Sequence, residues 1–185
     1  MNNPAVFVAN EQEDQEVDTE RYLQLANDVL IDEQAGDEIE VSIMFVDEQA
    51  IAELNEKFMG KKGPTDVLSF PIDDGPPEAG RVPDGGTSGP GDTGESEDVV
   101  SLLGDVVICP SVAARNAPEH AGTYDDELAL LLVHGLLHLL GMDHVEEDEA
   151  VVMEAREREL LQEYWRELPD TAWASTHPDL QAKDE

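Results

Sequence analysis

Three histidines in the C-terminal half of the chain have the spacing of metal ligands. His134 and His138 are four residues apart, so one helical turn places both imidazoles on the same face of a helix. Gly141 can end that helix, and His144 follows it closely enough to turn back toward the other two rings. Imidazole nitrogens about 2.0–2.1 Å from an ion are common zinc ligands. The spacing therefore predicts a zinc site formed by His134, His138 and His144.

The composition of this ligand set favours a catalytic metal over a structural one. Three protein ligands leave a fourth position open for water or substrate, whereas structural zinc sites are usually closed by four ligands, often cysteines. The chain contains a single cysteine, Cys109. We therefore expect the bound zinc to take part in a hydrolytic reaction.

The same spacing occurs in zinc peptidases whose helix reads H-E-x-x-H-x-x-G-x-x-H. Those enzymes use the glutamate after the first histidine as general base. Gly135 occupies that position here and has no side chain that can accept a proton. A metallopeptidase-like zinc hydrolase stays an alternative only if another carboxylate, such as Asp143, Glu146 or Glu147, replaces the missing base.

Basic residues are rare and uneven along the chain, which carries 44 acidic and 10 basic residues and a net charge of −34. Such a charge repels phosphate backbones and anionic membranes over most of the surface, so we expect no general DNA-binding or membrane-binding role. Lys57, Lys61 and Lys62 nevertheless lie within six positions, and Arg115 follows a predicted strand. We consider Lys61, Lys62 and Arg115 candidate phosphate contacts, since such cations form charge-assisted bonds with phosphate.

Hydrophobic periodicity predicts a sheet flanked by helices, in an α/β or α+β arrangement. After Asp47, a predicted helix would bury Ile51, Leu54 and Phe58 on one stripe. The segment 124–140 is apolar on nearly every side, so we expect a buried central helix that carries the metal ligands. A final helix is predicted over 146–168, with an apolar face that only Glu157 interrupts.

The length of 185 residues suits one domain, which we expect to span residues 1–168. Seven of the 14 glycines and four of the 11 prolines fall in residues 73–98, which predicts a flexible acidic insert. Residues 169–185 are predicted to form a C-terminal tail. The single cysteine and the lack of a recognisable secretion signal indicate a cytoplasmic protein.

Several segments together resemble the bacterial YbeY endoribonucleases, also called rRNA maturation factors. They occur in the order of that family, between about residues 40 and 165. The matching segments are Leu54-Asn55, Gly60 to Pro71, Gly104 to Cys109 and His134 to His144. Many family members carry an arginine, thought to handle the RNA phosphate, where this chain has Met59.

The resemblance implies a mixed four-stranded sheet with helices and one zinc ion held by His134, His138 and His144. It implies a zinc-dependent endoribonuclease, specific for single-stranded RNA, that acts in ribosomal RNA maturation, including 16S rRNA 3′-end processing, and in ribosome quality control. The expected partners are ribosomal RNA and the ribosome, with a ribosome-associated protein as a further candidate. Because Met59 replaces the arginine, a non-catalytic ribosome-associated zinc protein is also an alternative.

Overall fold

The structure is a computed structural model that describes residues 3–72 and 101–173. The predicted insert at residues 73–98 and the end of the predicted tail lie outside the described residues. Among the described residues, the sheet and helices together confirm the expected α+β architecture.

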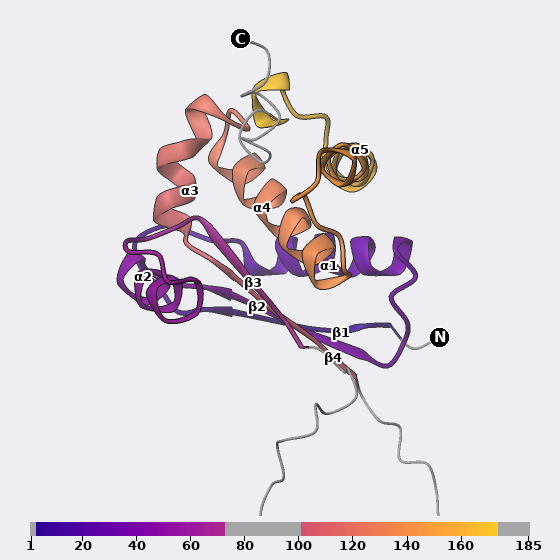
Figure 1. Ribbon diagram of the computed structural model, residues 1–185, viewed down its shortest axis with the longest axis horizontal. Helices are drawn as coiled ribbons and strands as arrows, with labels where there is room; N and C mark the ends of the chain where they lie inside the picture. The colour runs from indigo at the N-terminus through magenta and orange to yellow at the C-terminus, as the bar shows by residue number, and fades with distance from the viewer. Residues whose placement is uncertain (1–2, 73–100, 174–185) are drawn as a thin grey trace, which may run out of the picture.

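Four strands form one mixed sheet in the order β1-β2-β4-β3 (Figure 1). Strands β1, β2 and β4 run parallel, and β3 runs antiparallel to β4. The first and third strands are therefore the two edges of the sheet. The strands are β1 (Ala5–Asn10), β2 (Ile39–Phe45), β3 (Val67–Pro71) and β4 (Ser101–Ile108).

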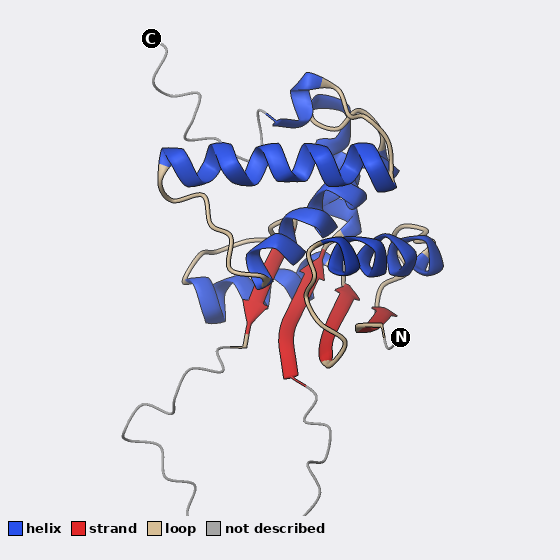
Figure 2. Cartoon of the chain, turned by 90° about the vertical axis from the view of Figure 1, so that its right-hand side faces the viewer, coloured by secondary structure: helices blue, strands red, loops and turns tan. Residues whose placement is uncertain are grey.

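Helices cover the two faces of this sheet unequally (Figure 2). The main helices are α1 (Thr19–Asp32), α2 (Glu48–Leu54), α3 (Pro110–Asn116), α4 (Tyr124–Leu139) and α5 (Glu147–Tyr164), and the short turns are η1 (Asn55–Met59), η2 (Ala117–Glu119) and η3 (Asp170–Ala172). Helices α1 and α4 contact one face, and α5 packs on α4. Side chains alternate along β4, so Val106 joins the main core while Val107 packs with Ile51 of α2 on the opposite face.

Helix α4 is the buried central helix that the apolar run predicts. The Thr123 hydroxyl accepts a hydrogen bond from the Asp126 backbone N–H and caps its first turn. At the other end, Gly141 has a φ of 95°, a left-handed conformation that glycine adopts without strain. This turn lets the chain reverse immediately after His138.

Within the described residues, no helix combines the length and apolar character needed to cross a membrane.

The predicted stripe of Ile51, Leu54 and Phe58 is wrong at its last position. Ile51 is fully buried, but Phe58 is 55% exposed. The helix continues from Leu54 into the π-helical turn η1, in which hydrogen bonds join residues five apart and the side chains no longer follow a 3.6-residue period. Phe58 is thereby turned away from the interior.

The packed part of the chain extends past the expected boundary at residue 168. Helix α5 ends at Tyr164, yet Leu168 and Trp173 are buried in the main core beside α5. The Arg158 guanidinium also lies 4.6 Å from the centre of the Trp173 ring. These apolar contacts with distant residues order a segment whose local sequence, around Pro169, predicts only a tail.

Candidate metal centre

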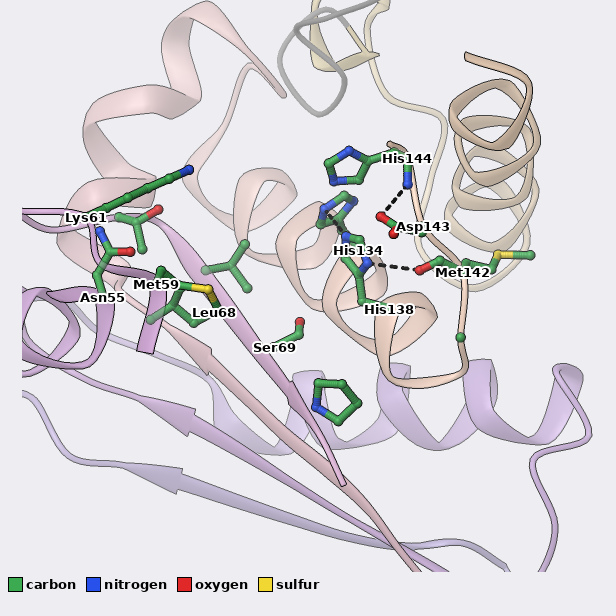
Figure 3. A pocket seen from close by; sticks show the side chains of 14 residues that line it. Asn55, Met59, Lys61, Leu68, Ser69, His134, His138, Met142, Asp143 and His144 are labelled. Atoms are coloured by element: carbon green, nitrogen blue, oxygen red, sulfur yellow. Dashed lines mark hydrogen bonds between the residues drawn. The ribbon is translucent and has the colours of Figure 1, made fainter. Parts of the chain in front are cut away.

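The three predicted ligands converge at the C-terminal end of α4 (Figure 3). One ring nitrogen from each of His134, His138 and His144 lies within 4.8 Å of the others. The Nε2 atoms of His134 and His138 are 3.1 Å apart. Two nitrogens bound to one tetrahedral zinc ion would be separated by roughly 3.3 Å, given Zn–N bonds of about 2.0–2.1 Å. The cluster therefore has the dimensions of a site for one divalent metal ion.

Hydrogen bonds at the opposite ring nitrogens orient two of these ligands. The His138 Nδ1–H donates to the Met142 carbonyl oxygen at 3.0 Å, and the Glu157 carboxylate lies 2.6 Å from Nδ1 of His134. With a proton on each Nδ1, the neutral rings direct the lone pairs of their Nε2 atoms at each other. Lone pairs at 3.1 Å repel unless a cation lies between them, so the donor set fits a bound metal ion.

The surroundings keep His138 in its metal-binding form. Burial, followed by the nearby His134 and His144 rings, lowers the pKa of His138 from 6.5 to about 4. The imidazole is therefore neutral near pH 7, as a metal ligand must be. His144 comes from the loop after Gly141, and its backbone N–H donates to the Asp143 carboxylate at 2.7 Å.

Glu157 is a functional residue that sequence reasoning missed. It is fully buried and comes from α5, 23 positions after His134. The apolar face of α5 carries Met153 and Leu160 on either side of it. An acid in the middle of such a face needs a buried partner, and that signal in the sequence could have identified it.

We expect Glu157→Gln to weaken metal binding by about tenfold, because the amide can still accept the His134 proton but no longer supplies a negative charge. A competition titration of the purified protein with a chromogenic chelator measures this affinity. Glu154→Gln is the matched control on α5, since Glu154 pairs with Arg158 and not with a histidine. Equal affinities for all three proteins would contradict an orienting role for Glu157.

The histidines open into a pocket of about 590 Å³ along the free edge of β3. Its other wall comes from the end of η1 and the loop after it, where Met59 and Lys61 lie across from the histidines (Figure 3). Asn55 holds this loop through two hydrogen bonds. Its side-chain amide donates to the Gly63 backbone carbonyl, and its backbone carbonyl accepts from the Lys61 backbone N–H. The pocket thus places one cation opposite the metal ligands.

The other predicted cations lie in different places. Lys62 is exposed on the same loop but does not line the pocket. Arg115 lies on α3, pairs with Glu48 and also lies outside the pocket lining. Of the three candidates, the structure brings only Lys61 to the histidines.

Gly135 faces the sheet and not the pocket. A Cβ atom built there would lie 2.6 Å from a Val106 methyl group and 3.2 Å from the Ser69 hydroxyl oxygen. Helix α4 therefore approaches β4 so closely that any side chain at this position would force its neighbours to shift. The glutamate of the peptidase motif could not be accommodated here, so a metallopeptidase would need a replacement base such as Asp143, which lines the pocket.

Comparison with known proteins identifies the family of this chain. The family model for endoribonuclease YbeY matches residues 7–165. A protein named endoribonuclease YbeY from Frankia casuarinae is 44% identical over 157 residues, covering 85% of this chain and 73% of the relative. One from Salinispora tropica is 41% identical over 162 residues, covering 88% of this chain and 96% of the relative.

A solved structure extends the similarity to three dimensions. The solution structure of TM1509 from Thermotoga maritima superposes with a TM-score of 0.53 at 26% identity, covering 86% of this chain and 89% of the other. The matched region of the family model includes nearly all of the sheet, α4 with its histidines and all of α5. The chain therefore belongs to the endoribonuclease YbeY family.

Proposed function

We propose that the protein is a zinc-dependent endoribonuclease that cleaves single-stranded RNA during ribosomal RNA maturation, including 16S rRNA 3′-end processing, and in ribosome quality control. The observation that carries this proposal is the pocket in which three converging imidazoles lie opposite Lys61. The relatives named endoribonuclease YbeY supply the class of substrate. The ligands are His134, His138 and His144.

The charge distribution supports an RNA strand in this pocket. Each arginine that the structure describes makes an ion pair with a carboxylate. Lys57, Lys61 and Lys62 make no ion pair with any described residue. These three lysines are thus available to phosphate; all come from η1 or the loop after it, and Lys61 lines the pocket.

Different residues of the pocket would orient the metal ligands, bind the phosphate and contact the rest of the RNA. Glu157 and the Met142 carbonyl hold the protons on Nδ1 of His134 and His138, so the Nε2 atom of each ring would be the one that binds the metal. Lys61 would bind a non-bridging oxygen of the scissile phosphate and balance part of its charge. When bound, zinc supplies Lewis acidity toward a phosphoryl oxygen and acidifies water. Met59 adds an apolar surface where many members of the family have an arginine.

The direct test is cleavage of matched single-stranded RNA, double-stranded RNA, single-stranded DNA and a peptide library by zinc-loaded and metal-stripped protein. We expect cleavage of single-stranded RNA alone, and only by the loaded form. Product ends then identify the attacking oxygen, because a 2′,3′-cyclic phosphate requires attack by the 2′-hydroxyl of the RNA and a 3′-hydroxyl requires attack by water. Cleavage of peptides and not RNA would overturn the proposal.

The remaining alternative, a non-catalytic ribosome-associated zinc protein, predicts zinc binding without RNA cleavage by the purified chain. The names of the relatives do not favour it.

We place the protein in the cytoplasm on the ribosome, with ribosomal RNA as partner and a ribosome-associated protein as an additional one. The free, buried thiol of Cys109 agrees with a reducing compartment.

Lys61→Ala should lower kcat/KM for single-stranded RNA by about tenfold, because it removes a charge-assisted contact with phosphate. Lys62→Ala is the matched control on the same loop, since it removes the same charge from outside the pocket lining. Its kcat/KM should change by less than about threefold, through general electrostatics alone. Equal losses in the two variants would show that only the net charge of the loop matters.

A further inference from the structure

Phe58 is a large apolar side chain that the fold exposes beside the pocket. The π-helical turn η1 directs it outward, and it is 55% exposed although it follows a well-packed helix. The next residue, Met59, lines the pocket, as does Lys61 two residues further on. Short π-helical turns are frequent at functional sites, where the extra residue redirects a side chain.

Neighbouring residues hold the Phe58 ring in place. The Phe70 ring of β3 packs against it with 5.2 Å between ring centres and 66° between ring planes, an edge-to-face contact. The Lys57 ammonium lies 5.1 Å from the centre of the Phe58 ring. The exposed ring is thus fixed on the edge strand and accompanied by a positive charge.

The pocket extends from the histidines toward this ring. Its lining includes both Leu68 and Ser69, whose side chains lie on opposite faces of β3. Ser69 faces α4, which carries the metal ligands, and Leu68 shares the opposite face with Phe70. A strand bound in the pocket would therefore cross the free edge of β3, with one end at the histidines and the other near Phe58.

We infer that Phe58 forms a base-stacking subsite for the single-stranded RNA substrate, with Lys57 and Lys61 binding the phosphates on either side of the stacked nucleotide. This inference rests on the proposed function. A nucleotide combines a flat base with an anionic phosphate, and an exposed ring beside unpaired lysines matches both parts. Proteins that bind single strands without sequence readout use this combination of aromatic surface and basic groove. A base inside a duplex cannot reach the ring, so the subsite would favour single strands.

The first test compares variants of the full chain loaded with zinc, on a single-stranded RNA of mixed sequence. Phe58→Leu keeps an apolar contact with Phe70 but has no aromatic face, so we expect KM to rise about tenfold while kcat stays within about twofold. Phe58→Trp should keep KM near the wild-type value. Phe7→Leu is the matched control, because Phe7 is 56% exposed on β1 at the opposite edge of the sheet and should leave both constants unchanged.

The second test locates the stacked nucleotide. A single abasic nucleotide is moved stepwise along the same RNA, and KM is measured with the wild type and with Phe58→Leu. We expect one position near the cleaved bond at which the missing base raises KM for the wild type by about tenfold but has no effect on the variant. The inference would be overturned if the KM increases from the abasic nucleotide and from Phe58→Leu simply multiplied at every position. An unchanged KM for Phe58→Leu would also overturn it, and in both cases RNA cleavage itself would persist. Failure of the wild type to cleave RNA would instead overturn the proposed function.

Discussion

His138→Ala is expected to lower kcat/KM for single-stranded RNA by a factor of about 10³ or more. The Nε2 atom of His138 lies 3.1 Å from that of His134, so the substitution removes one of the three proposed metal ligands. Metal-ion catalysis contributes several kcal/mol to transition-state stabilisation, and each 1.36 kcal/mol corresponds to about tenfold in rate. Steady-state cleavage of a fluorescent oligoribonucleotide by the purified variant measures the effect.

The control for this variant is another histidine outside the pocket. His120 contacts Glu127 at 3.4 Å and does not line the pocket, so His120→Gln should cleave RNA at nearly the wild-type rate. Stripping metal from the wild-type protein should reproduce the His138→Ala defect, and added zinc should restore cleavage to the wild type only. Undiminished cleavage by His138→Ala after metal removal would identify a contaminating nuclease or a mechanism without metal.

Gly135→Glu, which recreates the peptidase sequence, is expected to lower the free energy of unfolding by more than about 3 kcal/mol without creating peptidase activity. A Cβ atom alone would lie 2.6 Å from a Val106 methyl group. The rest of the glutamate would have to enter the interface between α4 and the sheet, where overpacking costs about 1–3 kcal/mol and burying an unpaired carboxylate costs more. Urea denaturation followed by circular dichroism measures the change.

Two further variants separate packing from charge. Gly135→Ala should be destabilised by about 1–3 kcal/mol, because the added methyl group meets the same neighbours even though alanine favours helix. Ile31→Glu introduces the same acid at a half-exposed position of α1 and should change stability by less than about 1 kcal/mol. If Gly135→Glu were as stable as the wild type, the close approach of α4 to β4 would be refuted.

The metal ligands could be predicted from sequence because their arrangement is mostly local. His134 and His138 share a helical face through the period of the helix, and Gly141 supplies the turn that brings His144 back. The strands and helices were predictable for a similar reason, since each carries its own hydrophobic period. The family resemblance supplied the mixed four-stranded sheet, but the order of its strands was not predicted, because local periodicity does not determine which strands pair.

The features that could not be predicted depend on contacts between distant segments. The sequence could mark Glu157 as a buried acid but not its partner, His134, which it reaches because α5 packs on α4. Arg115 likewise pairs with Glu48 from another helix. Phe58 leaves its predicted buried position because the helix changes to a π-helical turn. Trp173 is buried in the main core through contacts with segments distant in the sequence and not through any local signal.

The central claim is that three imidazoles bind one zinc ion and leave a position open. X-ray absorption at the zinc edge, combined with elemental analysis of the purified full chain, tests it most directly. We predict one zinc ion per chain with three histidine nitrogens at about 2.0–2.1 Å and one further light atom from solvent. A chain that binds no zinc on supplementation, or a sulfur ligand from Cys109 in the zinc shell, would contradict the proposed site.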